Sequence, residues 1–193
     1  RIFEGEYLNG KGKEYNPFNK LIFEGEYLNG KRNGKGIEYY YNGKILFEGE
    51  YLNGKRWNIK EYDINGNMVY ELKGGKGYMK EYGYNTNVLF EGEYLNGLRN
   101  GKGKEYFNNK LIFEGEYLND ERHGKGKEYY YNGKLLFEGE YFYGKRWNVK
   151  EYDIDNNIIY ELKNGKGFIK EYSYLGYLIF EGRYSNGEKN GCG

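Results

Sequence analysis

Aromatic and charged positions alternate along short stretches of the chain. Residues 23–27 read Phe-Glu-Gly-Glu-Tyr, which places two rings and a glycine on one side and two carboxylates on the other. Alternation with a period of two is typical of a β-strand with one packed and one solvated face. Asn29-Gly30 follows, and Asn-Gly between alternating runs is a strong signal for a β-hairpin turn. Residues 35–41, rich in tyrosine, are the predicted second strand, so the pattern predicts a hairpin over residues 23–46.

The same hairpin pattern recurs throughout the chain. Its copies start near residues 3, 23, 47, 70, 90, 113, 137, 160 and 180, at intervals of 20 to 24 residues. A regular period of this length is typical of repeat proteins, in which each unit packs mainly on its neighbours. Residues 23–112 correspond to residues 113–193 with a shift of 90, which indicates duplication of a block of four units. We therefore expect residues 1–193 to form a single repeat array.

The composition favours an all-β fold. The chain of 193 residues has 20% aromatic residues and 32 glycines, and it contains no alanine. Tyrosine and phenylalanine favour strands, glycine marks turns, and alanine is the best helix former. An isolated hairpin is only marginally stable in water, so the hairpins must stack on one another. The sequence therefore predicts an antiparallel β-meander of about eight to nine consecutive hairpin repeats of 20–24 residues.

The aromatic face of the first strand in each hairpin is the predicted core. Gly25 shares this face with Phe23 and Tyr27, and we expect its missing side chain to make room for a ring from the adjacent strand. We expect the second-strand tyrosines, such as Tyr39, to complete the packed face, and the paired first-strand glutamates to face water. The register stays open at this point, because a slip of one residue exchanges the two faces of a strand.

The charges and the single cysteine exclude several classes of protein. Thirty basic and 29 acidic side chains leave a net charge of +1, which argues against a dedicated nucleic-acid-binding protein. No apolar run approaches the ~20 residues of a transmembrane helix, so we expect no transmembrane segment. Cys192 is the only cysteine, which excludes an intramolecular disulfide bond and is typical of a reducing compartment. We expect a cytoplasmic protein and, because Arg1 is not a natural start, a segment of a longer chain.

No residue pattern points to catalysis, a metal or a cofactor. His123 is the only histidine, and catalytic triads and metal sites need partners that the sequence lacks, so we interpret it as a turn residue. Glu24 and Glu26 are a carboxylate pair of the kind that glycosidases use. The pair recurs from unit to unit, however, whereas a catalytic pair is normally unique, so we interpret it as a solvated face. We therefore expect neither enzymatic activity nor a bound cofactor.

Two sets of residues are candidates for binding. The basic turn residues are expected along one long edge of the sheet, where they would meet phosphates or an acidic partner. The alternative is that they pair with strand glutamates. The aromatic residues would line a groove for a peptide or helix, and the alternative is that they pack only on one another. The candidates are Lys31, Arg32, Arg56, Arg99, Arg122 and Arg146 for the turns, and Tyr27, Tyr51, Trp57, Tyr94, Tyr117, Tyr141 and Trp147 for the groove.

The recurring residues resemble those of the MORN (membrane occupation and recognition nexus) repeat family. Gly-Glu-Tyr, a turn glycine and Gly-Lys-Gly recur with a spacing near 23, and the unit at Phe113 carries the family-like turn from Arg122 to Gly126. The chain departs from the family where Tyr27 replaces the usual tryptophan, and where the units at 70 and 160 lack Gly-Glu. The resemblance implies an elongated, twisted antiparallel sheet with an aromatic groove.

The resemblance also implies possible roles. Family members serve as scaffolds, as self-associating arrays and as appendages of enzymes, and phosphoinositide binding has been proposed for them. Our first hypothesis is a non-catalytic scaffold that binds a protein partner, or a second copy, through the groove or the open terminal strands. The alternatives are a peripheral membrane module that binds phosphoinositides or other anionic lipids through basic turns, and a regulatory appendage of an enzyme outside this segment.

Overall fold

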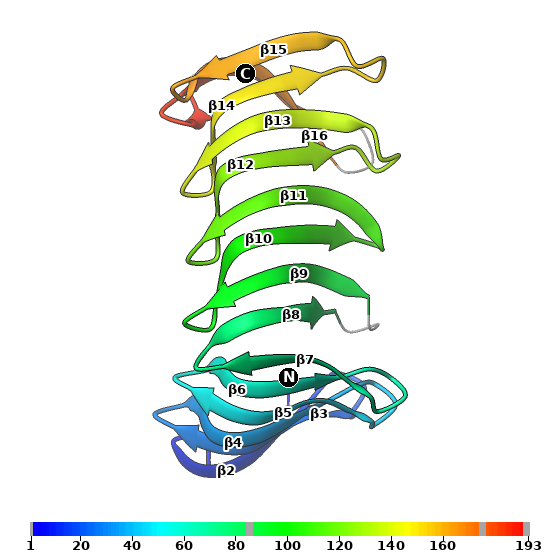
Figure 1. Ribbon diagram of the computed structural model, residues 1–193, viewed down its shortest axis with the longest axis vertical. Coiled ribbons are helices and arrows are strands. Elements are labelled where there is room, and N and C mark those ends of the chain that lie inside the picture. Colours follow the sequence, from blue (N-terminus) through cyan, green and yellow to red (C-terminus); the bar gives the residue numbers. More distant parts are fainter. Residues whose placement is uncertain (1, 84–86, 174–176, 191–193) are drawn as a thin grey trace. The chain divides into compact units, whose positions relative to one another are not determined.

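The regular secondary structure of the described residues is all β-strand. The computed structural model describes residues 2–83, 87–173 and 177–190. These residues form eighteen strands and no helix, which confirms the predicted all-β fold (Figure 1). Accordingly, this part of the chain contains no helix long and apolar enough to cross a membrane.

The strands are short and follow one another at regular intervals. The first nine are β1 (Ile2–Gly5), β2 (Asn9–Tyr15), β3 (Leu21–Leu28), β4 (Lys31–Tyr39), β5 (Ile45–Leu52), β6 (Lys55–Tyr62), β7 (Met68–Lys73), β8 (Lys76–Tyr82) and β9 (Val88–Leu95). The others are β10 (Leu98–Phe107), β11 (Lys110–Leu118), β12 (Glu121–Tyr129), β13 (Leu135–Phe142), β14 (Lys145–Tyr152), β15 (Ile158–Lys163), β16 (Lys166–Tyr172), β17 (Leu178–Ser185) and β18 (Glu188–Lys189).

Strands that are neighbours in the sequence pair with each other in antiparallel fashion. The chain forms two compact units, one of residues 1–87 with 93–98 and the other of residues 88–92 with 99–193. In the first unit each strand from β1 to β7 pairs with the next one. In the second unit the same holds from β10 to β17 (Figure 1). Each unit is therefore an antiparallel β-meander, as the sequence predicts.

The Asn-Gly turns adopt the backbone conformation that their sequence favours. Asn29 and Gly30 have φ angles of 51° and 71°, and Asn53 and Gly54 have φ angles of 51° and 86°. Positive φ at both central residues is typical of a type I′ hairpin turn, which asparagine and glycine adopt with little strain. These turns set the point at which each hairpin reverses.

The core is a row of rings on one face of the strands, here called the aromatic face. Phe23 is 0% exposed and Tyr27 is 5% exposed. Phe23 makes edge-to-face contacts with Tyr27 and with Tyr51 of the next repeat, at centroid distances of 5.7 Å and 5.3 Å. Equivalent ring contacts recur in the second unit. Because Phe23 and Phe113 each touch rings of their own and of the following repeat, this packing links neighbouring repeats within each unit.

Glycines within the strands provide the space that these rings fill. A Cβ atom on Gly36 would lie 2.7 Å from the ring of Phe23 and 3.0 Å from the ring of Tyr51, which come from the two adjacent strands. A Cβ atom on Gly25 would lie 2.6 Å from Phe23 in the same strand. The prediction that Gly25 makes room for a ring of an adjacent strand is therefore wrong, because the ring over Gly25 belongs to its own strand; the second-strand glycine Gly36 has that role instead.

The pairing of β3 with β4 assigns side chains to the two faces. Phe23 lies opposite Glu38, so Glu38 shares the aromatic face. Tyr39 therefore points to the other face, where its hydroxyl donates a hydrogen bond to Glu24 at 2.5 Å. The prediction that second-strand tyrosines complete the packed face is wrong, because the second strand is one residue out of the expected phase. A glutamate takes that place under the rings instead.

Candidate interaction surface

Glu38 on the aromatic face is half-buried and paired with two arginines. The Oε1 atom of Glu38 lies 2.8 Å from Arg56 Nε and accepts a 2.8 Å hydrogen bond from the hydroxyl of Tyr51. Its Oε2 atom lies 3.4 Å from Nη1 of Arg32. Burial by itself would raise the pKa of Glu38, but the two guanidinium groups outweigh it and lower the pKa to about 2. This carboxylate is therefore ionised and fully engaged within the protein.

Several arginines join glutamates of two consecutive repeats. Arg32 contacts Glu14 at 2.8 Å and Glu38 at 3.4 Å. Because the two glutamates lie on different hairpins, the arginine ties the hairpins together through its planar guanidinium group. The second unit repeats this ladder of alternating charges, in the order Glu105, Arg122, Glu128, Arg146 and Glu171.

The same arginines cover the phenylalanine rings. The Arg32 Cζ atom lies 3.8 Å from the centre of the Phe23 ring, a distance typical of cation–π stacking. The prediction that turn arginines line a solvent-facing basic edge is wrong for four of them, because rings and carboxylates draw their guanidinium groups onto the aromatic face. Lys31 stays exposed at its turn. The four are Arg32, Arg56, Arg122 and Arg146, whose side chains are only 17–23% exposed, and Arg99 also stacks on a ring, that of Phe90 at 4.2 Å.

The tyrosines that were candidates for an open groove are buried in the same network. Their hydroxyls donate hydrogen bonds to second-strand glutamates, and none of their side chains is more than 7% exposed. They are Tyr27, Tyr51, Tyr94, Tyr117 and Tyr141. Trp57 and Trp147 lie half-buried at hairpin ends, where their carbonyls accept hydrogen bonds from Gly75 and Gly165. The rings of the aromatic face are therefore occupied by contacts within the protein.

Glu151 is a buried glutamate that is poorly neutralised, because the hairpin turn that follows it, residues 163–166, contains no arginine. Glu151 is 0% exposed, and its Oε2 atom accepts a 3.0 Å hydrogen bond from the backbone N–H of Lys170. Its Oε1 atom has no hydrogen-bond partner within the described residues. Burial raises the pKa of Glu151 to about 7. Glu61, its counterpart in the first unit, is also buried with a raised pKa, but it has an additional 2.7 Å hydrogen bond from Tyr82.

The opposite face of the first unit, here called the polar face, is hollowed. One hollow of about 540 Å³ lies over β1 to β4, and another of about 590 Å³ lies over β4 to β7. Each is lined by three lysines and three glutamates, and both share Lys35, Gly36 and Ile37. Because strand glycines form part of the lining, no side chain fills the space between the charged residues there.

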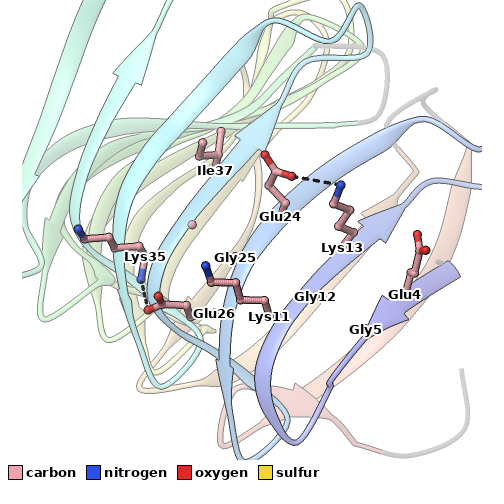
Figure 2. A pocket seen from close by; sticks show the side chains of 11 residues that line it. Glu4, Gly5, Lys11, Gly12, Lys13, Glu24, Gly25, Glu26, Lys35 and Ile37 are labelled. Carbon is pink, nitrogen blue, oxygen red and sulfur yellow. Dashed lines mark hydrogen bonds and ion pairs between the residues drawn. The ribbon is translucent and has the colours of Figure 1, made fainter.

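Figure 2 shows how charges of opposite sign alternate across the first of these hollows. Lys13 Nζ lies 3.6 Å from Glu24 Oε2, and both side chains are well exposed. Glu26 accepts a 2.9 Å hydrogen bond from the backbone N–H of Lys35. Exposed pairs of this kind contribute little to stability. They remain available to exchange partners when a ligand with its own charges and amide groups arrives.

Ile37 interrupts this charged surface at the boundary of the two hollows. It is half-buried and lies opposite Glu48. The corresponding position in the other repeats is always lysine, and in the second unit Lys127 pairs with Glu138 at 3.2 Å. Reasoning from the sequence missed the polar face because lysine–glutamate rows look like ordinary solvated positions. The single isoleucine among the equivalent lysines was the sequence feature that could have indicated a binding surface at Ile37.

The structure holds little that is typical of catalysis. Within the described ranges no group of three or more His, Cys, Asp or Glu side chains could hold a metal ion. His123 lies at a hairpin end, where its Nδ1 atom accepts a 3.4 Å hydrogen bond from the backbone N–H of Tyr143. Cys192, interpreted from the sequence as an incidental thiol, lies outside the described residues.

Comparison with known proteins identifies the repeats. The model of the MORN repeat family matches residues 23–45, 90–111, 113–134 and 180–193. No curated protein sequence matches the chain significantly. These four matches confirm the resemblance drawn from Gly-Glu-Tyr and Gly-Lys-Gly, and two of them cover the β3–β4 and β11–β12 hairpins. MORN repeats are non-enzymatic modules that typically bind proteins or lipids.

Proposed function

We propose that this MORN-repeat chain is a non-catalytic scaffold that binds an extended segment of a protein partner on the polar face of its first unit. The observation that carries this proposal is the pair of adjoining hollows, with alternating lysines and glutamates around Ile37. A cytoplasmic location belongs to the same proposal.

The distribution of contacts between the two faces supports the polar face as the binding surface. On the aromatic face, rings stack on rings and arginines stack on phenylalanines, and the half-buried Glu38 is held by Arg32 and Arg56. A partner would have to break these contacts to reach the rings. On the polar face, the exposed lysines that line the hollow, such as Lys35, can meet a partner without such a loss.

The charge pattern supports a peptide rather than an anionic membrane. A membrane surface attracts clusters of like positive charge, worth about 1 kcal/mol for each basic residue near the surface. Both hollows carry equal numbers of lysines and glutamates, and the turn arginines are withdrawn onto the aromatic face. An extended peptide with alternating charges and an apolar side chain opposite Ile37 meets this surface better than lipid head groups do.

Two further roles stay compatible with the same surface. Binding of a second copy would make the scaffold self-associating, and a partner domain in the same polypeptide would make it a regulatory appendage. Strand addition at β1 or at the other terminal strand stays a prediction.

Replacement of Ile37 by lysine tests the proposal. The Ile37→Lys variant carries the residue found at every other equivalent position, so we expect it to fold normally. A photo-reactive residue at position 37 should crosslink the wild-type array to a discrete partner in a host lysate, and Ile37→Lys should no longer retain that partner in a pull-down. The matched control is Lys127→Ile, which changes the equivalent site of the second unit.

Anionic vesicles provide the opposing test. We expect no sedimentation of the array with phosphoinositide vesicles at low salt. Sedimentation that disappears at high salt, together with unchanged partner retention by Ile37→Lys, would contradict the proposal and support the lipid alternative.

A further inference from the structure

Two pairs of hairpins in the chain are nearly identical in sequence and differ mainly at one place. Residues 23–62 and 113–152 align without gaps and differ at eight positions. Two of the differences exchange one aliphatic residue for another, and a third is Ile37, discussed above. The remaining five lie in or next to two hairpin turns, where Gly30, Lys31, Asn33, Leu52 and Asn53 correspond to Asp120, Glu121, His123, Phe142 and Tyr143.

These five residues lie at the ends of the β11–β12 and β13–β14 hairpins, which are on the left of Figure 1. The ring of His123 lies 5.6 Å from that of Phe142 and 5.0 Å from that of Tyr143. Phe142 also contacts Tyr143 at 4.7 Å and Trp147 at 5.4 Å. The second unit thus has an aromatic cluster where the first has leucine and asparagine.

The cluster is exposed rather than packed. Phe142 is 47% exposed and Tyr143 is 51% exposed. Exposed rings of this size bury little area within the protein, so stability does not explain why leucine and asparagine are replaced here. Rigid aromatic side chains at a surface are instead typical anchors for a partner.

Tyr143 occupies a strained backbone position. Its φ is 47°, in the left-handed region that a side chain with a Cβ adopts at a loss of free energy. Four other turns have asparagine at the equivalent position, and asparagine tolerates this region. Its φ is between 51° and 54° at Asn29, Asn53, Asn96 and Asn186. A tyrosine that is both strained and exposed suggests a role outside folding.

The turn next to the aromatic one carries two acidic residues, and the Oδ1 atom of Asp120 accepts a 2.7 Å hydrogen bond from the backbone N–H of Arg99. Asp120 and Glu121 are exposed, and they replace a glycine and a lysine of the first half. The Gly144 N–H donates a 2.9 Å hydrogen bond to the carbonyl of Arg122, which holds the aromatic turn against the acidic one. Lys145 is the nearest cation of the turn, and it is paired with Glu188 at 2.6 Å.

We propose that His123, Phe142, Tyr143 and Trp147, together with Asp120 and Glu121, bind a lysine or arginine side chain presented by a basic peptide. Ring faces attract cations through their quadrupole, and the two carboxylates reinforce this attraction. The site lies in the second unit, so the proposal stands independently of the polar face of the first unit.

The first half of the chain supplies the matched variants. Phe142→Leu with Tyr143→Asn, and separately Asp120→Gly with Glu121→Lys, install residues that already form turns at the equivalent positions. Both variants are therefore expected to fold. The probe is a fluorescein-labelled Gly-Ser peptide that carries several arginines, with an otherwise identical glutamate peptide as the control. Binding to the full chain is measured by fluorescence anisotropy.

We expect saturable binding of the arginine peptide, about tenfold weaker in each double variant, and no binding of the glutamate peptide. The chain has two tryptophans, so its NMR spectrum has two indole N–H signals. The signal of Trp147 should shift on titration while that of Trp57 does not. The proposal would be overturned if the variants bound the arginine peptide as tightly as the wild type, or if both indole signals shifted equally. It would also be overturned if the chain preferred the glutamate peptide or phosphatidylcholine vesicles.

Discussion

Removal of Arg56 tests the interpretation of the aromatic face. Arg56→Ala breaks the 2.8 Å ion pair with Glu38 and uncovers the ring of Phe47, which lies 3.8 Å from the guanidinium carbon. Loss of one partner from a buried pair costs about 3–5 kcal/mol, and a cation–π contact is worth about 0.5–2 kcal/mol. Arg32 remains 3.4 Å from the carboxylate, and the Arg56 side chain is 23% exposed. We therefore expect a loss of about 2–4 kcal/mol.

Equilibrium unfolding in urea, followed by far-UV circular dichroism, measures this loss. The control is Lys13→Ala, which breaks the exposed pair with Glu24 and should change the free energy of unfolding by less than about 1 kcal/mol. The double variant Glu38→Leu with Arg56→Met should recover part of the loss, because it removes both buried charges. A loss for Arg56→Ala no larger than that of the control would refute the assignment of these charges to a buried network.

Three other predictions follow from the geometry. Between pH about 4.5 and 7 the folded chain keeps a proton on Glu151 that the unfolded chain releases, so this group makes stability fall as the pH rises through this range; Glu151→Gln should reduce that fall in urea midpoints, with the smaller contribution of Glu61 left in place. Gly36→Ala should lower the free energy of unfolding by about 1–3 kcal/mol, because its Cβ atom would meet the rings of Phe23 and Tyr51; an unchanged urea midpoint would contradict this packing. Tyr143→Asn should raise the melting temperature, since asparagine relieves about 1 kcal/mol of backbone strain; a lower melting temperature would mean that the exposed ring stabilises the fold.

The repeat pattern predicts the hairpins because local chemistry decides them. Asn29-Gly30 can form a type I′ turn without help from the rest of the chain, and the spacing of Phe23 and Tyr27 sets one face of a strand. The meander then follows from equal repeats, each of which needs its neighbours to bury its rings.

The phase of the second strand is not a local property. Glu38 and Tyr39 are neighbours, and polarity alone favours the tyrosine for the core. What reverses this preference is Arg56, 18 residues further along the chain, which neutralises the glutamate and covers the adjacent ring. A sequence reading that paired each second-strand glutamate with the arginine of the following turn would have found the correct face.

The polar face escaped prediction for a related reason. Lysine and glutamate at alternating positions are what a solvated strand also carries, so only the departure from the pattern at Ile37 distinguishes a binding surface. In the same way, the turn from Phe142 to Trp147 was recognisable only as a change between two otherwise equal halves.

The most direct test of the proposed scaffold is lysine acetylation of the array, measured by mass spectrometry with and without its crosslinked partner. Lys11, Lys13 and Lys35 line the first hollow and are exposed in the free chain, as are the turn residues Lys31 and Lys55. Binding on the polar face predicts that the partner protects the first three lysines and leaves the two turn lysines reactive. Protection of Lys31 and Lys55, with Lys11, Lys13 and Lys35 still reactive, would contradict the account.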